Sequence, residues 1–157
     1  MTTIEFSNGA IIEGFVSFDV INHKRNHMEL YGTKGSIIVP DPNMFGGPVS
    51  ISLSEGGKWN EHSVEEMQLG RTNIINHSGK SNEAAKQSNY RGVGLSEMIY
   101  AIENDFEHRC NEKLILHVLD MLDTTIQSAK KSSTLNLRTT CSKTKQFTES
   151  EVALIVK

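Results

Sequence analysis

The chain has 157 residues, of which 37% are hydrophobic and 22% are charged, with a formal net charge of −3 at pH 7. This composition is that of an ordinary globular protein rather than of a disordered chain, and the length suits one domain with its own core. The slight negative charge argues against a nucleic-acid-binding surface and against a basic patch for a membrane.

The cysteine content and the first residues indicate a compartment. Cys110 and Cys141 are the two cysteines, and the opening MTTIEFSNG has no basic region followed by an apolar one. We therefore expect two thiols in a reducing, cytoplasmic environment rather than a disulfide in a secreted protein. No run approaches the roughly 20 apolar residues of a membrane span, so no membrane association is expected.

The first quarter of the chain predicts a β-hairpin. Residues 4–6 and 11–20 are rich in strand-forming residues and flank Asn8-Gly9. This dipeptide is a strong hairpin signal, because a tight primed turn needs a positive φ at both central residues. We expect a long second strand that runs to Val20.

Further strands follow up to residue 64. Gly32-Thr33-Lys34-Gly35 predicts the turn of a second hairpin. Successive strands joined by tight turns favour an antiparallel sheet with one buried face. The predicted strands of this region are residues 28–31, 36–39, 49–53 and 59–64.

Residues 91–128 predict two amphipathic helices joined by a short connector. Asn104 is suited to closing the first helix, since Asn tolerates a left-handed conformation. Asn111 is the expected N-cap of the second, with Glu112 in its first turn. The expected buried faces are Leu95, Met98, Ile99 and Ile102 in the first helix, and Ile115, Val118, Leu119, Leu122, Ile126 and Ala129 in the second.

The rest of the chain completes the predicted fold. Residues 70–89 are polar and read as a long loop, which in a compact domain is usually functional or mobile. Residues 134–137 are expected to form a last strand, and residues 152–156 a further edge strand. The order of elements predicts a single α+β domain over residues 1–157, with a mostly antiparallel open sheet and the helices packed on one face.

Motifs for known chemistries are missing from the sequence. There is no GxGxxG after a strand, no P-loop, no GxSxG elbow and no paired CxxC. His23 and His27 are four apart, but no third ligand for a metal ion lies near them. His117 and Asp120 share a helix flank and read either as a general acid–base pair or as a surface histidine beside a solvated carboxylate.

Tyr90 and Arg91 are the candidate ligand-binding residues. They stand where the long polar loop meets the start of a helix, a place where side chains and free N–H groups can meet a small polar ligand. The alternative is that the two side chains only cover the base of the loop. No catalytic constellation is visible.

Several strings taken together resemble one family. They are Phe6-Ser7-Asn8-Gly9-Ala10, the segment 31–36 followed by Pro40, the Arg91-Gly92-x-Gly94-Leu95 opening, residues 98–102, His108-Arg109, and Leu116-His117-Val118-Leu119-Asp120. In this order and spacing they resemble the C-terminal end of the glucose–fructose oxidoreductase / inositol dehydrogenase / MocA (Gfo/Idh/MocA) family. The match extends loosely from Ile4 to Cys141.

The resemblance implies a two-domain NAD(P)-dependent oxidoreductase. In that family an N-terminal Rossmann domain binds NAD or NADP, and the C-terminal domain shapes the substrate pocket and carries the subunit interface. The catalytic lysine of a Glu-Lys-Pro motif and the acid–base Asp and His all precede the equivalent of Thr3, and the sequence offers no substitute. We therefore expect most of a C-terminal domain without its Rossmann domain. Such a chain would bind no cofactor and be inactive alone.

The implied function is binding of a sugar, polyol or related substrate whose secondary alcohol exchanges a hydride with the cofactor. Of the residues in hand, Tyr90 and Arg91 fall at a motif that lines the substrate pocket in inositol-dehydrogenase-like relatives. The rival interpretation is a free-standing, non-enzymatic dimeric ligand-binding module of the same fold. An in-frame Rossmann half encoded upstream of Met1 would favour the enzyme.

The strand pattern also predicts a homodimer through the open sheet face. Ile11, Phe15 and Tyr31 are expected on that face, because an interface core favours aromatic residues inside a polar rim. The opposite face is expected to meet the helices. The predicted contacts there join Ile12, Val16, Phe18 and Val20 to Leu95, Ile99, Leu119 and Leu122.

Overall fold

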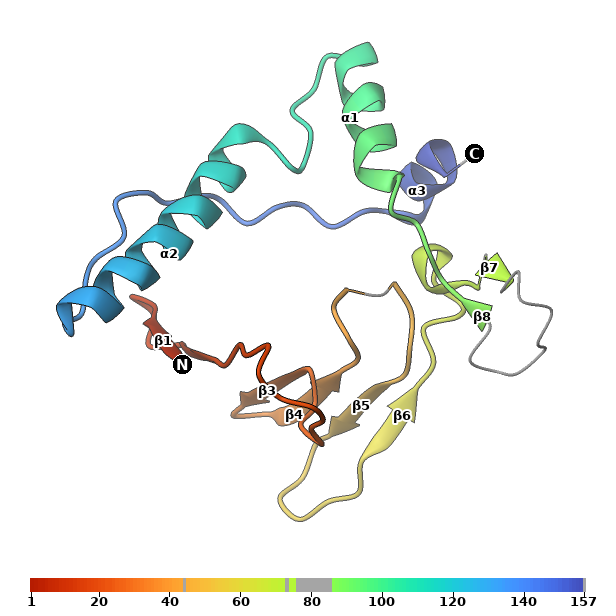
Figure 1. Cartoon of the computed structure of the whole chain (residues 1–157). Helices are drawn as coiled ribbons and strands as arrows, with labels where there is room; N and C mark the ends of the chain where they lie inside the picture. The colour runs from red at the N-terminus through yellow and green to blue at the C-terminus, as the bar shows by residue number, and fades with distance from the viewer. Residues whose placement is uncertain (44, 73, 76–85, 157) are drawn as a thin grey trace. The chain divides into compact units, whose positions relative to one another are not determined.

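The structure is a computed structural model that describes residues 1–43, 45–72, 74–75 and 86–156. The chain divides into two compact units, and Figure 1 labels most of their elements. Unit 1 comprises Met1–Lys24 and Cys110–Lys143, and unit 2 comprises Arg25–Arg109 and Thr144–Lys157. Each unit is described by itself.

Unit 1 opens with an antiparallel hairpin of β1 (Thr2–Glu5) and β2 (Ile11–Gly14), with Ile4 opposite Ile12. Its turn differs from the predicted one. The Gly9 N–H donates to the Phe6 carbonyl and the Phe6 N–H to the Ala10 carbonyl, each at 2.9 Å. Only Gly9 of the turn has a positive φ, +86°. The hairpin therefore uses a three-residue loop with glycine in the left-handed position, rather than a two-residue primed turn.

The predicted long strand over residues 11–20 is wrong beyond Gly14. Gly14 lies opposite Thr2, the first residue of β1, so the partner strand ends where β2 ends. The apolar residues that follow have no ladder to join within the hairpin. Phe15 remains 62% exposed and Phe18 98%.

The long helix of unit 1 is α2 (Glu112–Lys131), which begins where its sequence predicts and runs past the predicted end at residue 128. Asn111 is the N-cap, because its Oδ1 accepts from the Leu114 N–H at 3.1 Å. Glu112 lies in the first turn and two lysines lie in the last, as the helix dipole favours. The strand predicted at residues 134–137 is not formed. The backbone N–H groups of Arg138 and Thr139, which follow it, bind the Asp120 carboxylate instead.

Unit 2 contains a four-stranded antiparallel sheet with its strands in sequence order, β3 (Met28–Gly32), β4 (Gly35–Val39), β5 (Val49–Ser52) and β6 (Asn60–His62). The predicted turn between β3 and β4 is confirmed, with Gly32 opposite Gly35. Gly35 has φ +153°, and a Cβ there would lie 2.6 Å from the Ser52 carbonyl oxygen. These strands and the helices confirm the α+β class with an open antiparallel sheet.

The remaining elements of unit 2 are short, apart from α1. They are the 3₁₀ helix η1 (Gln68–Gly70), the antiparallel pair β7 (Ile74–Ile75) and β8 (Lys86–Gln87), α1 (Val93–Glu103) and α3 (Glu149–Ile155). Residues 73 and 76–85 of the predicted 70–89 loop lie outside the described residues. In the part that is described, no helix is long and apolar enough to cross a membrane.

The ends of the helices in unit 2 are set by local hydrogen bonds. Asn104 is the C-cap of α1, as predicted, but the left-handed residue is the next one, Asp105. The edge strand predicted at residues 152–156 is wrong, since that segment lies within and just beyond α3. Thr148 and Glu151 form a capping box that begins this helix, and the cap outweighs the strand preference of the β-branched residues.

The predicted apolar faces of both helices are not buried. Leu95 and Ile102 of α1 are 64% and 71% exposed, and Leu122 of α2 is 59% exposed. The helices bury Glu97, Ala101 and Asp120 instead. The whole chain exposes 13238 Å² of accessible surface. Two separately compact units sharing this mass would expose about 9,400 Å² together, so the chain exposes more surface than two such units would.

Gly70 gives a test of the packing in unit 2. A Cβ at this buried position would clash with the Val64 carbonyl oxygen. We expect Gly70→Ala to lower the free energy of unfolding by roughly 1–3 kcal/mol, the usual cost of overpacking, as measured by urea denaturation. Gly94→Ala in α1, where a Cβ meets nothing within 4 Å, is the control and should be neutral or stabilising. Equal stability of the two variants would contradict this packing.

Candidate functional site

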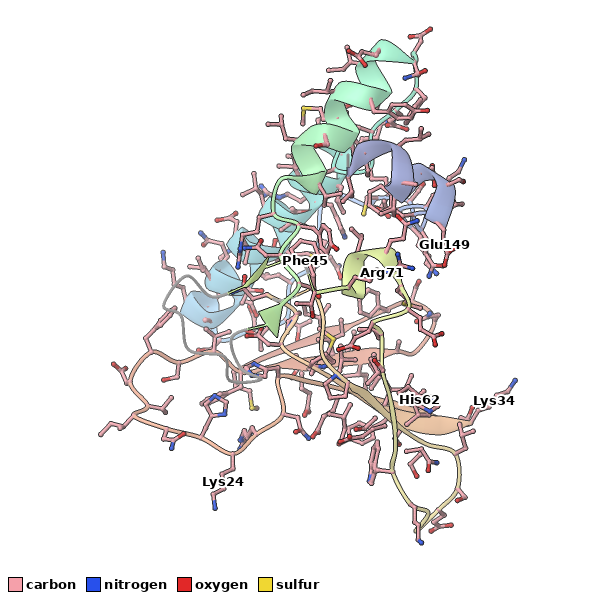
Figure 2. All side chains as sticks on the ribbon, turned by 90° about the vertical axis from the view of Figure 1, so that its right-hand side faces the viewer. Lys24, Lys34, Phe45, His62, Arg71 and Glu149 are labelled. Atoms are coloured by element: carbon pink, nitrogen blue, oxygen red, sulfur yellow. The ribbon has the colours of Figure 1, made fainter. Side chains whose placement is uncertain are left out.

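Tyr90 lies three residues before the first residue of α1, and the Val93 N–H donates to its carbonyl at 2.8 Å. The Tyr90 hydroxyl donates to the Arg71 carbonyl at 3.1 Å. Its ring stands edge-on to that of Phe45, with ring centres 5.7 Å apart and planes at 72°. Phe45 and Arg71 are both labelled in Figure 2. The ring is therefore fixed on one side by an aromatic contact and at its tip by a hydrogen bond.

The Arg91 side chain contacts Asn43, which lies in the loop that precedes β5. Its Nη2 donates to the Asn43 carbonyl at 3.3 Å and to the Asn43 Oδ1 at 3.2 Å, and its backbone N–H donates to Asn89. Arg91 is exposed, and both side-chain bonds use the same nitrogen. Among the described residues Nε and Nη1 have no partner, so three of the five guanidinium N–H groups are available.

The segment under Tyr90 is held from below by Ser88. This buried side chain donates from Oγ to the Gly70 carbonyl at 2.5 Å. A Cβ on Gly46 would come within 2.8 Å of the same Oγ, so three backbone segments meet closely here. Tyr90 and Arg91 thus stand on a fixed base, which we call the Tyr90–Arg91 platform.

A second polar cluster of unit 2 is centred on Arg109. Its Nη1 lies 3.1 Å from Oε1 of Glu97, whose side chain is 4% exposed, and its Nη2 lies 2.8 Å from Oε1 of Glu151. The Arg109 backbone N–H donates to both Glu97 oxygens at 3.1 and 3.2 Å. One residue therefore ties α1 to the start of α3.

The rest of the Arg109 guanidinium binds the segment before α3. Nε donates to the Lys145 carbonyl at 2.9 Å and Nη2 to the Gln146 carbonyl at 3.2 Å, and the group lies 4.1 Å from the centre of the Phe147 ring. Burial opposes the charge on Arg109, but the bonds from Glu151 and Glu97 outweigh it and raise the pKa of this guanidinium. Removing Arg109 would leave a buried carboxylate unpaired, which typically costs about 3–5 kcal/mol.

Unit 1 has a similar cluster around Asp120. Its Oδ2 accepts from the backbone N–H groups of Arg138 (2.7 Å) and Thr139 (2.9 Å) and from the Thr139 hydroxyl (2.9 Å). Its Oδ1 accepts from Arg138 Nε at 3.0 Å and from the Thr124 hydroxyl at 3.3 Å. Burial alone would raise the pKa of Asp120, but the hydrogen bonds from Arg138 and Thr139 hold it well below its usual range.

His117 joins this cluster through Thr139. The His117 Nδ1 lies 3.0 Å from the Thr139 Oγ1. The structure thus brings His117 and Asp120 together through a hydroxyl group, rather than as the direct pair that their spacing suggests. Elsewhere, Nδ1 of His108 is buried without a hydrogen-bond partner in the described part of the chain.

Other sequence candidates gain less from the structure. His23 and His27 lie in an irregular segment between β2 and β3. Within the described residues, no group of three or more His, Cys, Asp or Glu side chains could hold a metal ion. Sequence reasoning missed the structural roles of Glu97, Arg109 and Thr139. The signal for Glu97 was a charged residue four positions before Ala101, on the helix face that the structure buries.

Comparisons of the chain with protein-family models, with curated proteins and with solved structures find no match.

The Arg109 cluster predicts an acid-sensitive stability. The Arg109 bond, followed by the bonds from Thr148, lowers the pKa of Glu151 from 4.5 to about 2. A carboxyl group whose pKa is lower in the folded state stabilises the fold above its unfolded pKa, and this contribution is lost as pH falls through the folded value. We therefore expect the urea midpoint to fall between about pH 5 and pH 2, and Glu151→Gln to flatten this dependence.

The control is Glu149→Gln, which changes an exposed carboxylate of the same helix turn, labelled in Figure 2. It should leave the slope of stability against pH close to that of the wild type. If Glu151→Gln and Glu149→Gln give the same slope, Glu151 does not carry the acid-sensitive contact.

Proposed function

We propose that this chain is the substrate-binding and dimerisation domain of an NAD(P)-dependent oxidoreductase of the Gfo/Idh/MocA type, acting on a secondary alcohol of a sugar, polyol or related compound. The observation that carries the proposal is the Tyr90–Arg91 platform. Its two side chains are positioned by Phe45, Arg71 and Asn43, yet keep hydrogen-bonding capacity for a ligand.

The chemistry of the platform suits a molecule with several hydroxyl groups. The Tyr90 hydroxyl gives its hydrogen to the Arg71 carbonyl, so its oxygen still accepts a hydrogen bond. The free N–H groups of Arg91 donate. A polyol offers donors and acceptors on neighbouring carbons, and it can therefore satisfy both side chains at once. A fixed acceptor beside a fixed donor also orients the ring or chain of the ligand.

The residues that carry the family resemblance support the proposal in a second way. Arg109 and Asp120, both in the quoted strings, are the centres of the two polar clusters. Two residues of the strings that resemble the family are therefore ones that this fold uses for its own stability. This support concerns the kind of domain, and the substrate rests on the platform alone.

In the parent enzyme the nicotinamide cofactor would accept or supply the hydride, and this domain would hold the alcohol and keep water away from it. The described strand pairs are all antiparallel. Dinucleotide sites of the Rossmann type are built on a parallel βαβ unit. The proposal places the cofactor on another domain and assigns no step of hydride transfer to this chain.

The rival proposal is a free-standing, non-enzymatic dimeric binding module. It uses the same platform and the exposed apolar residues of each unit, such as Ile11 and Phe15 in unit 1 and Tyr31 in unit 2. The two proposals share ligand binding and differ in whether a cofactor-binding domain belongs to the same polypeptide.

Ligand binding at the platform is tested with inositol as the probe. We expect added inositol to shift the backbone NMR signals of Tyr90 and Arg91 in the intact chain. Arg91→Ala should weaken binding at least about tenfold, equivalent to ~1.4 kcal/mol, because it removes the donors. Lys34→Ala, in the exposed turn between β3 and β4, is the control and should bind as the wild type does.

The outcome against the proposal is equally specific. If inositol shifts the protein backbone signals identically in the wild type and in Arg91→Ala, Arg91 only covers the base of the loop. An absence of shifts with inositol and with other polyols would remove the platform as a substrate site.

The proposed dimer is tested by light scattering. At micromolar concentration we expect twice the 17.5 kDa mass of one chain, since an exposed aromatic residue such as Phe15 gains by burial in an interface. Phe15→Arg should give the monomer with unchanged helical circular dichroism. Thr33→Arg adds the same charge at an exposed turn and should remain a dimer. A wild-type mass near 17.5 kDa rejects the proposal.

A further inference from the structure

The Thr139 hydroxyl in unit 1 has two neighbours and one hydrogen. Its Oγ1 lies 2.9 Å from the Asp120 Oδ2 and 3.0 Å from the His117 Nδ1. A hydroxyl group donates one hydrogen bond and accepts others through its lone pairs. The neighbour that receives this hydrogen determines which ring nitrogen of His117 carries a hydrogen.

The Asp120 carboxylate must receive that hydrogen. It is buried and accepts five hydrogen bonds, two of them from backbone N–H groups, which favour the ionised form. An ionised carboxylate has no hydrogen to donate. The 2.9 Å contact with Oγ1 therefore requires the Thr139 hydrogen, and toward His117 the same oxygen can only accept.

We propose that Asp120 and Thr139 hold the neutral His117 ring in its Nδ1–H form, so that Nε2 serves as a proton acceptor on the surface of α2. Nδ1 must carry a hydrogen to bond Oγ1, and in a neutral imidazole Nε2 then keeps its lone pair. Nε2 has no hydrogen-bond partner among the described residues, and His117 as a whole is only partly buried.

The acceptor fixes the class of ligand. A bare Nε2 takes a hydrogen bond, or a proton, from a donor such as an alcohol hydroxyl, and it repels carboxylates and phosphates that offer only lone pairs. Thr139 is then a positioning residue, because it sets the ring state without touching the ligand. The inference is independent of the proposed function, since Tyr90 and Arg91 belong to the other unit.

The ring state is measured directly by long-range ¹H–¹⁵N NMR of the intact chain, recorded at rising pH until the ring is neutral. In the wild type we expect Nδ1 of His117 to give the protonated, pyrrole-type signal and Nε2 the unprotonated, pyridine-type signal. Thr139→Val removes the acceptor and should shift the ring toward the Nε2–H form. Thr139→Ser restores a hydroxyl and should return it to the Nδ1–H form.

Two outcomes overturn the inference. One is a wild-type His117 in the Nε2–H form, and the other is a Thr139→Val spectrum identical to that of the wild type. Thr139→Val keeps the backbone N–H groups that bind Asp120, so its fold is expected to persist. The wild-type spectrum decides the ring state even if a variant does not fold, and the Ser variant separates a positioning role from a loss of packing.

Discussion

Unit 2 depends on the pairing of Arg109 with Glu97. Glu97 lies on α1 with a side chain that is 4% exposed, and a carboxylate so buried needs a charged partner and hydrogen-bond donors. Arg109 supplies both, through its guanidinium and its own backbone N–H. The rest of the guanidinium then holds the segment before α3 and the first turn of that helix. Without this pair, α1 and α3 would lose the polar link that joins them.

In unit 1 a different buried carboxylate has the same structural role. Asp120, in the middle of α2, binds two successive backbone N–H groups of the segment that returns along the helix. In each unit a buried acid on a helix thus fixes a later, irregular segment. Such bonds are directional and cannot be shared among alternative packings, as apolar contacts can. They specify where the segment lies, while the apolar side chains do not.

The sequence predicts what is encoded locally and fails where distant partners decide. The caps at Asn104 and Asn111 and the turn at Gly32–Gly35 depend on neighbouring residues and were found. The predicted extension of β2 beyond Gly14 is wrong, because the pairing of this strand depends on where β1 begins. The strands predicted at residues 134–137 and 152–156 are wrong. A hydrogen bond to Asp120 just after the first segment and the capping box before the second outweigh the strand preference of these residues.

The same distinction between local and distant determinants applies to the candidate site. Position in the sequence was enough to select Tyr90 and Arg91, since a helix start after a polar loop is visible in one chain. Their partners Asn43, Phe45 and Arg71 lie 19 to 48 residues away and were not predictable. The relay from Asp120 to His117 was also hidden, because its middle member Thr139 follows α2 by eight residues.

The polar bonds of Arg109 and Asp120 bear on the exposed apolar residues of α1 and α2. The periodicity of α1 and α2 is real, yet Leu95, Ile102 and Leu122 remain more than half exposed. Monomeric proteins rarely leave large contiguous apolar patches to solvent, and such patches usually mark interfaces. Because Arg109 and Asp120 already fix the backbone around each helix, the faces exist before any partner covers them. A partner would then meet a preformed surface, and little ordering entropy would oppose its binding.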